Sequence, residues 1–332
     1  MCIQTTDKQA PEGRVLEGCA KVPWLLILLS LVLAGFLPVA NAASSKSKAG
    51  STTNRRSYTI AQNPYVGAIV VNVANGAVLF EDRADTKGYP ASVLKLMDLL
   101  IILEKIEQGQ LSLQDKVPVS RKATMAGTSK VWLTERESFT LEEMLYALMV
   151  HSANDVAVAL AEKVAGSTDA FVDLMNAKAR ALGMKDTEFH SVHGLPPARG
   201  EKDDITTARD LSILCREVLK HPQALRYTTT RTRVFRPNAG KRTMNMQNHN
   251  PLLGKVEGCD GLKTGYIAKA GFSIAVTAWR NGQRVIVIVL GSTERKLRDA
   301  KAIELVDKGF TRLSGSPAPA NRAKSTSRRT AR

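Results

Sequence analysis

Residues 92–103 constrain the fold more than any other stretch of this 332-residue chain. Apolar side chains fill every position except Ser92, Lys95 and Asp98. Because a helix that is apolar around its whole circumference has to be covered on all sides, the stretch predicts a buried central helix. Pro90 lies just ahead of it, where a helix tolerates proline. The rest of the chain must supply the layers that surround this helix.

Strand patterns lie near both ends of the folded region, with helical patterns between them. Alternating residues flank the turn pairs Asn75-Gly76 and Asn281-Gly282, which predicts two hairpins. The predicted strands are 66–73, 77–81, 261–265, 271–279 and 284–290, and the further predicted helices are 141–150, 155–164, 169–182, 207–219 and 295–310. The sequence therefore predicts an α+β fold, with an antiparallel sheet built from both ends of the domain, covered by helices, and a helical insert at about 110–225.

Residues 1–42 predict a secretory signal peptide. The apolar run 24–39 is followed by Ala40-Asn41-Ala42, a small-x-small cleavage pattern. An uncleaved membrane anchor is the alternative, but the run is shorter than the ~20 apolar residues that a spanning helix needs, and it contains Pro38. We therefore expect the chain to be exported, to the periplasm or the cell envelope.

Much of the net charge of +16 lies outside the predicted domain of residues 59–313. A linker at 43–58 and a tail at 314–332 carry lysines and arginines without any acidic residue, and their Ser-, Ala- and Pro-rich composition predicts disorder. Basic flanks can bind nucleic acid, but an exported chain meets anionic envelope polymers and lipid headgroups first. We expect electrostatic contact between the tail and an anionic envelope surface, and no nucleic-acid partner.

Two of the four cysteines, Cys2 and Cys19, lie in the predicted signal peptide, which leaves Cys215 and Cys259 in the mature chain. The sequence leaves a disulfide between these two open. The helical spacing of Cys215 with neighbouring apolar residues favours a buried free thiol at that position.

Ser92 and Lys95 place a hydroxyl and an amine three residues apart on the predicted buried helix. Side chains at that spacing share one face, so the amine can reach the hydroxyl. Burial disfavours the ammonium form, as does a second cation nearby, and a neutral lysine can act as a base. The start of the helix also leaves the Ser92 N–H available to an oxyanion. The spacing alone is a weak signal, because Ser45 and Lys48 repeat it in low-complexity sequence.

Two further segments carry polar groups suited to the same chemistry. Ser152 and Asn154 lie between two predicted helices, where a hydroxyl can pass protons and a carboxamide can accept from a lysine, although both are also preferred helix caps. The segment 263–265, Lys-Thr-Gly, lies on a predicted strand. Its cation and hydroxyl can hold a carboxylate, and its glycine lets an extended peptide approach the strand edge. A turn with a solvated lysine is the alternative.

Together these segments form the Ser-x-x-Lys, Ser-x-Asn and Lys-Thr-Gly set of penicillin-recognising acyl transferases, in the required order. Over roughly residues 64–312 the chain resembles the low-molecular-mass penicillin-binding proteins, the serine D-alanyl-D-alanine carboxypeptidases. The resemblance extends to the stretches 90–92, 154–161, 181–184, 193–195, 207–211 and 260–265. It implies a fold like that of penicillin-binding proteins and β-lactamases for residues 59–313.

The resemblance also implies a reaction and a role for each site residue. The implied catalytic residues are Ser92, the acylated nucleophile, Lys95, its base, and Ser152 with Asn154, a proton relay. The implied substrate-binding residues are Lys263, Thr264, Gly265 and Tyr266, whose N–H would be the second oxyanion donor. Such an enzyme removes the terminal D-Ala from peptidoglycan stem pentapeptides through an acyl-enzyme, is inhibited covalently by β-lactams and needs neither a metal nor another cofactor.

Three residues depart from the family pattern. Leu94 replaces the usual Thr before the lysine, without touching an implied role. Arg136 stands where the family has a loop glycine, and His151 occupies the rim position before Ser152, so we expect a groove of altered shape. After the catalytic domain there is a basic tail instead of a β-rich domain and an amphipathic anchor helix, which speaks against stable membrane attachment.

Other functions use similar residues. A DD-endopeptidase that cuts peptidoglycan crosslinks would share the whole site, whereas a serine β-lactamase would need a Glu-x-x-Leu-Asn segment between Asn154 and Lys263, and we find none. His190 and His193 with Asp203 or Asp204 offer ligands to a zinc peptidase, but they lack the His-Glu-x-x-His helix that such enzymes often use. Intact Ser92 and Lys95 argue against a non-catalytic envelope-binding protein.

Overall fold

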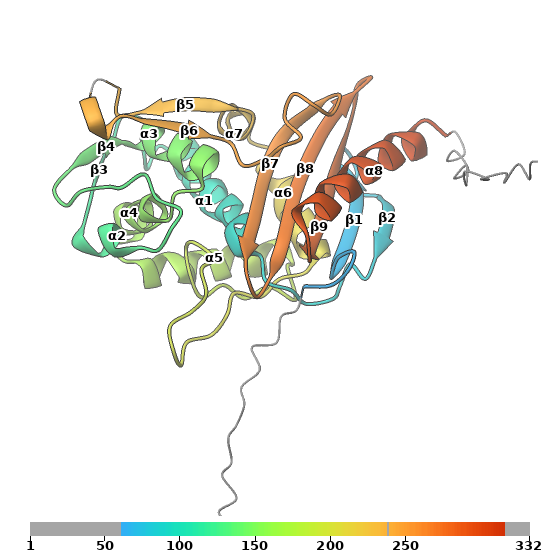
Figure 1. The fold of residues 1–332 in the computed structure, drawn as a ribbon, viewed down its shortest axis with the longest axis horizontal. Helices are drawn as coiled ribbons and strands as arrows, with labels where there is room; N and C mark the ends of the chain where they lie inside the picture. The colour runs from blue at the N-terminus through green and yellow to red at the C-terminus, as the bar shows by residue number, and fades with distance from the viewer. Residues whose placement is uncertain (1–60, 238, 316–332) are drawn as a thin grey trace, which may run out of the picture. The chain divides into compact units, whose positions relative to one another are not determined.

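The computed structural model describes residues 61–315 except residue 238. The predicted signal peptide, the predicted linker and the tail from residue 316 onward lie outside the described residues. A five-stranded antiparallel sheet in the order β2-β1-β9-β8-β7 runs through the domain (Figure 1). Its strands are β1 (Gly67–Asn72), β2 (Val78–Asp82), β7 (Cys259–Ile267), β8 (Gly271–Arg280) and β9 (Gln283–Ser292).

Strand β1 shows why both faces of this sheet are covered. Ile69 and Val71 pack into one hydrophobic core, whereas Ala68 and Val70 pack into a second core. Successive side chains of a strand point to opposite faces, so one strand serves two cores. Because β1 also pairs with β9, the early and late parts of the chain meet inside the sheet. The predicted α+β fold class is confirmed.

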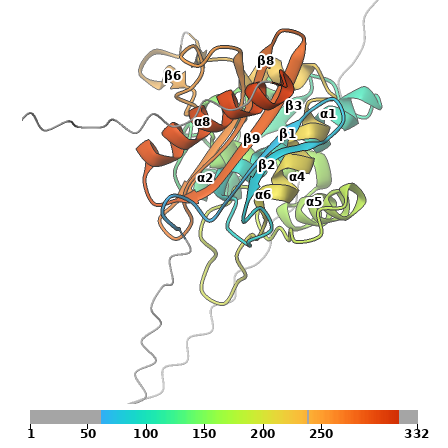
Figure 2. The same ribbon diagram turned by 90° about the vertical axis from the view of Figure 1, so that its right-hand side faces the viewer.

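Helices supply the other half of each core. Helix α8 (Arg295–Leu313) lies along one face of the sheet, and its buried Leu305, Val306 and Phe310 belong to the second core. Helices α1 (Lys95–Glu107) and α6 (Ala208–Val218) lie on the other side (Figures 1 and 2). Residues 95–103 of α1 are all buried, as the apolar pattern predicts.

The start of α1 differs from the prediction. Residues Ala91–Leu94 form a 3-10 turn, η1, and the α-helix begins at Lys95. Ala91 has a φ of 46°, in a region that side chains other than glycine rarely adopt. Ser92 therefore lies on a tight turn in front of the helix, which hydrophobic periodicity alone cannot distinguish from a first helical turn.

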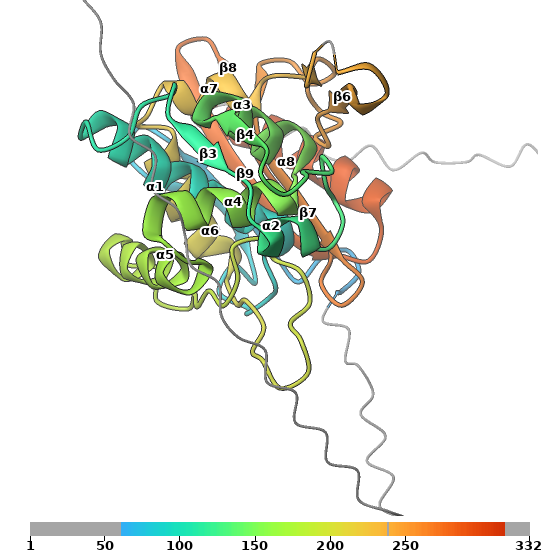
Figure 3. The ribbon, with the colours of Figure 1, turned by 90° about the vertical axis from the view of Figure 1, so that its left-hand side faces the viewer.

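The remaining elements form a helical region beside the sheet (Figure 3). Its helices are α2 (Arg121–Met125), α3 (Leu141–Tyr146), the π-helical turn η2 (Ala147–His151), α4 (Asn154–Ala165), α5 (Thr168–Leu182), α7 (Gln223–Thr228) and the short turn η3 (Gly240–Arg242). Two small antiparallel sheets pair β3 (Lys116–Pro118) with β4 (Ser138–Thr140), and β5 (Thr232–Phe235) with β6 (Met244–Gln247). These strands of three or four residues carry too little alternation to be predicted.

Helix ends follow local chemistry. The side chains of Ser167 and Thr207 accept backbone N–H groups at the starts of α5 and α6. Helix α5 ends at Leu182, as predicted, and its C-cap residue Gly183 has a φ of 78°. Cys215 on α6 is a fully buried free thiol, and Cys259 is free as well. Across residues 61–315, apart from residue 238, we find no helix with the length and apolar character that a membrane span requires.

Candidate active site

The three predicted motif segments meet at one groove of about 820 Å³. Ser92 reaches it from η1, Ser152 and Asn154 from the junction of η2 with α4, and Thr264 from β7. Buried Lys95 and Lys263 lie next to these residues and bond to them. The long separation of the segments in the sequence is bridged by the antiparallel sheet and the central helix.

The amine of Lys95 is the centre of the site. Its Nζ lies 3.0 Å from Ser92 Oγ, 2.7 Å from Asn154 Oδ1 and 2.9 Å from the carbonyl oxygen of His193. The side chain is fully buried, and this burial lowers the pKa of Lys95 to about 7. Nearby carboxylates, of which Asp98 has the largest effect, offset part of that shift.

This arrangement suits a neutral amine. A neutral amine has two N–H donors and one lone pair, and two of its three neighbours, Asn154 Oδ1 and the His193 carbonyl, can only accept. If both N–H groups serve those oxygens, the lone pair faces the hydroxyl of Ser92. Lys95 is then placed to take the Ser92 proton, which is the geometry that a general base needs.

Two glycines allow η1 to sit where it does. A Cβ on Gly265 would lie 2.6 Å from the carbonyl oxygen of Pro90, so β7 can approach the turn closely only without a side chain. Gly194 has a φ of 76°, and a Cβ there would collide with the backbone of Ala91. The close approach of the turn that carries Ser92 is a second reason for glycine at position 265, beside the predicted approach of a substrate peptide, which remains a prediction.

Ser152 and Asn154 are held by irregular backbone. Ser152 has a φ of 61° directly after the π-helical turn η2, and strain of this kind is frequent at functional sites. Asn154 Nδ2 donates to the carbonyl oxygen of Gly127 at 3.1 Å, which leaves Oδ1 facing Lys95. Ala153 is the N-cap residue of α4, and no side chain caps this helix. The helix-cap alternative for these two residues is therefore wrong.

Lys263 extends the polar network along β7. It is 2% exposed, and its Nζ donates to Ser152 Oγ at 2.9 Å and to the carbonyl oxygen of Thr264 at 3.0 Å. The alternative of a turn with a solvated lysine is thus wrong. Burial and the positive charge of Lys95 hold the pKa of Lys263 well below its usual range. The predicted repulsion between the two lysines lowers the pKa of Lys263, whereas the pKa of Lys95 is lowered by burial.

The outer wall of the groove belongs to β7, which is the last strand of the sheet. Thr264 and Gly265 line the groove, and Tyr266 is 54% exposed, with its ring stacked on Phe272 at 4.2 Å between centroids. An edge strand keeps unpaired backbone groups that an extended peptide can bind. The oxyanion role of the Tyr266 N–H remains a prediction.

His151 and Arg136, which depart from the family pattern, have clear places in the structure. The ring of His151 lines the groove 5.7 Å from that of His249, and burial lowers the pKa of His249 to about 4, so this side of the groove carries uncharged imidazoles near neutral pH. Arg136 has a φ of 71°, a left-handed conformation that glycine adopts readily. The loop thus keeps a glycine-like backbone despite the arginine.

Three contributors to the site have no motif in the sequence. Asp98 is buried one helical turn after Lys95, the backbone carbonyl of His193 accepts from Lys95, and Asp155 accepts the N–H groups of Val131 and Leu133. A carbonyl carries no residue-specific signal. The stretch 193–195 is part of the family resemblance, and this is the feature of the sequence that indicates a role for His193.

The residues proposed as zinc ligands have other partners. Asp204 accepts the backbone N–H of His190 at 2.6 Å and the hydroxyl of Ser191 at 2.7 Å. His190 Nε2 lies 3.1 Å from Glu188 Oε1, and His193 Nδ1 accepts the N–H of Leu195 at 3.2 Å. Asp203 pairs with Lys269 at 2.6 Å. These contacts shape the loop that presents the His193 carbonyl to Lys95, and they favour the serine mechanism over the zinc alternative.

Comparison with known proteins gives the same picture. The model of the peptidase S11 family, described as D-alanyl-D-alanine carboxypeptidase, matches residues 56–294. DacF of Bacillus subtilis is 32% identical over 290 residues, which are 87% of this chain and 72% of the relative. DacC of Escherichia coli is 30% identical over 282 residues, which are 83% of this chain and 66% of the relative. The chain thus spans about two thirds to three quarters of these relatives.

Solved structures resemble the described domain as well. DacD from Francisella tularensis has a TM-score of 0.70 and 26% identity, covering 77% of this chain and 72% of that one. Penicillin-binding protein D2 from Listeria monocytogenes, in its ampicillin-bound form, has a TM-score of 0.66 and 32% identity, covering 74% of this chain and 97% of that one. With the family model matched across the domain that holds Lys95 and its partners, the chain belongs to the D-alanyl-D-alanine carboxypeptidase family.

Proposed function

We propose that the chain is a serine D-alanyl-D-alanine carboxypeptidase that removes the terminal D-Ala from peptidoglycan stem pentapeptides through an acyl-enzyme on Ser92. The observation that carries this proposal is the position of Lys95 Nζ, which lies within hydrogen-bond distance of Ser92 Oγ and of two acceptor oxygens. The solved ampicillin-bound form of penicillin-binding protein D2 supports the proposal that β-lactams bind to this chain as well.

In the proposed acylation, Ser92 Oγ attacks the carbonyl carbon of the penultimate D-Ala while its proton passes to Lys95 Nζ. The peptide C–N bond then breaks, and the departing amine of the terminal D-Ala takes the proton that Lys95 received, passed on through the hydroxyl of Ser152. Ser152 is placed for that transfer, because its hydroxyl bonds to Lys263 and lines the groove. Backbone N–H groups of Ser92 and Tyr266 would hold the oxyanion. Water then hydrolyses the ester, which restores Ser92.

Lys263 and Thr264 would bind the terminal carboxylate of the substrate. A carboxylate beside Lys263 supplies the negative charge that this buried amine lacks, so substrate binding favours the ammonium form of Lys263. Lys95 stays neutral at the same time, since its burial disfavours its ammonium form. The two lysines can thus serve opposite purposes, one as a base and one as an anchor.

Intact-mass measurement after incubation with penicillin tests the proposal. We expect one covalent adduct on the native chain and none on Ser92→Ala. An adduct that persists in Ser92→Ala would refute the assignment of the nucleophile. A parallel assay with a stem pentapeptide and with a crosslinked dimer separates carboxypeptidase from endopeptidase activity. Release of D-Ala from the pentapeptide is expected, and cleavage of the dimer alone would favour the endopeptidase.

We also propose that the chain is exported and works in the cell envelope. The proposed substrate belongs to peptidoglycan, an envelope polymer, and residues 1–42 carry the pattern of a secretory signal. Electrostatic contact between the basic tail and an anionic envelope surface belongs to the same proposal.

A further inference from the structure

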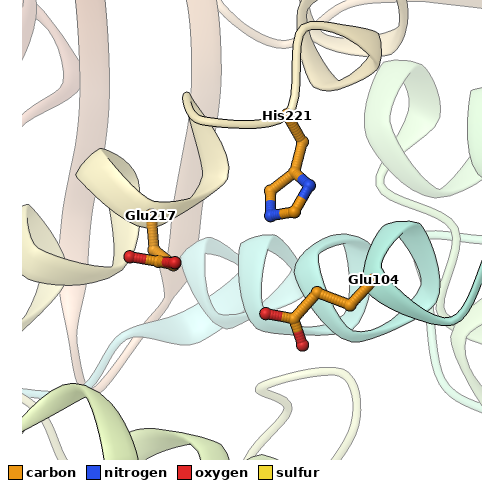
Figure 4. Close-up of side chains that lie close together, drawn as sticks. All are labelled: Glu104, Glu217 and His221. Atoms are coloured by element: carbon orange, nitrogen blue, oxygen red, sulfur yellow. The ribbon is translucent and has the colours of Figure 1, made fainter. Parts of the chain in front are cut away.

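Three side chains of the types that can bind a metal ion lie close together away from the groove, at the other end of α1. Within residues 61–315, excluding residue 238, one cluster brings three such donors together: Glu104 on α1, Glu217 on α6 and His221 just after α6. One donor atom from each residue lies within 4.8 Å of the other two. Figure 4 shows the three side chains converging from two helices and the turn that follows the second.

His221 is oriented as a ligand would be. The residue is 9% exposed, and its Nδ1 lies 2.7 Å from Glu107 Oε1, so a neutral ring donates its Nδ1–H to that carboxylate. Its Nε2 has no hydrogen-bond partner in the described part of the chain and faces the carboxylates of Glu104 and Glu217 (Figure 4). Metal-bound histidines commonly use one ring nitrogen for the metal and give the other N–H to a carboxylate.

Positive charge already balances the two acids. Glu104 pairs with Lys178 of α5 at 2.6 Å, and Glu217 pairs with Lys220 at 2.7 Å. The Lys220 side chain is 65% exposed, so this second pair contributes little. Lys178 is more enclosed, and its Nζ lies 2.8 Å from Oε1 and 2.6 Å from Oε2 of Glu104. A metal ion would therefore have to displace the Lys178 ammonium from Glu104.

We propose that Glu104, Glu217 and His221 bind one zinc ion, with water as the fourth ligand and Glu107 as the group that orients the histidine. One imidazole nitrogen and two carboxylate oxygens suit Zn²⁺, whereas Mg²⁺ and Ca²⁺ prefer oxygen ligands alone. The ion would join the end of α1 to the end of α6. It would stabilise the native state and would take no part in the proposed reaction at Ser92.

Titration calorimetry of the full chain with zinc chloride tests this site. We expect the native chain to bind one zinc ion more than Glu217→Gln and His221→Gln bind. His249→Gln is the control, because it removes a histidine that belongs to neither proposed set of zinc ligands, and it should keep the native stoichiometry. The cysteines and the other groups that can bind zinc are the same in these chains. The difference in the number of bound zinc ions therefore reports on the cluster alone. Circular dichroism identifies a variant that fails to fold. If His221→Gln does not fold, the stoichiometry of Glu217→Gln, at a partly exposed residue, is the comparison that tests the site.

Two further variants test the geometry. Lys178→Met should bind zinc more tightly than the native chain, because no ammonium then competes for Glu104. Glu107→Gln should bind it roughly 10- to 100-fold more weakly, the usual cost of losing a carboxylate behind a ligating histidine. The proposal is overturned if the Glu217→Gln variant and the His221→Gln variant each bind as much zinc as the native chain. An unchanged affinity in Lys178→Met would overturn it as well.

Discussion

Asp98 lies one helical turn after Lys95, is 2% exposed, and neither of its carboxylate oxygens has a hydrogen-bond partner among the described residues. Burial raises the pKa of Asp98 well above its usual range, while the charge of Lys95 acts in the opposite direction. A carboxyl group in such a place is more easily kept protonated than ionised. Apolar periodicity predicts that position 98 is buried, but it gives no information on the protonation of the group.

Asp98→Asn should therefore gain stability relative to the native chain as the pH rises. The folded chain holds the Asp98 proton more tightly than the unfolded chain, so native stability falls when the pH rises above the ordinary carboxyl pKa of about 4. Asparagine has no proton to lose in this range. Urea unfolding of both chains at about pH 4 and pH 7 measures the difference. A difference that is the same at both pH values would contradict the buried acid.

Lys95→Arg should abolish most of the acylation by penicillin, because a guanidinium stays charged and cannot accept the Ser92 proton. We expect the rate to fall at least about 100-fold. Lys105→Arg, on the exposed side of the same helix, is the control and should react normally. In the native chain the rate should fall below a pH of about 7, where Lys95 gains its proton. Native-like acylation of Lys95→Arg would refute the role of Lys95 as the base.

Among the secondary-structure elements, the sequence predicts those that are long and have a periodic pattern of hydrophobic residues. The central helix, the five strands of the main sheet and the closing helix all follow from hydrophobic patterns. The 3-10 turn at residues 91–94 and the π-helical turn at residues 147–151 do not, although they position Ser92 and Ser152. Both depend on close contacts between segments that are distant in the chain, such as β7 against η1.

The Gly265→Ala variant tests the close contact between β7 and η1. An added Cβ would lie 2.6 Å from the Pro90 carbonyl oxygen, so β7 or the turn has to move, and penicillin acylation should fall far more than thermal stability does. Gly309→Ala on α8, away from the groove, is the matched control, since its Cβ would meet only the side chains of Val70 and Val285. Stopped-flow acylation and thermal unfolding of both variants measure this. Equal acylation by the two variants would show that the close approach is dispensable.

At the scale of the whole molecule, the flanking segments differ from the domain in their charge. The tail from residue 314 carries five basic residues and no acidic one, and it has too few large apolar residues to insert into a bilayer as an amphipathic helix. Sequence composition thus predicts an electrostatic contact for the tail.

Deletion of residues 314–332 should weaken sedimentation of the chain with anionic vesicles at low salt and leave pentapeptide hydrolysis unchanged. Each basic residue near an anionic surface contributes about 1 kcal/mol, and this attraction is lost as the Debye length shrinks to roughly 3 Å at molar salt. Vesicles of neutral lipid are the control. If both chains sediment equally with anionic vesicles at low salt, the tail is no tether.

The strand order β2-β1-β9-β8-β7 has a consequence for biogenesis. Lys263 reaches Ser152 across 111 residues of sequence, and β7 joins the sheet through β8 and β9, which are made after it. Ser92 emerges early from the ribosome, yet it has no complete surroundings until nearly the entire domain has followed. Such non-local pairing is slow to form. A fluorescent penicillin would therefore label only chains that have finished folding, which makes this domain a reporter of its own maturation.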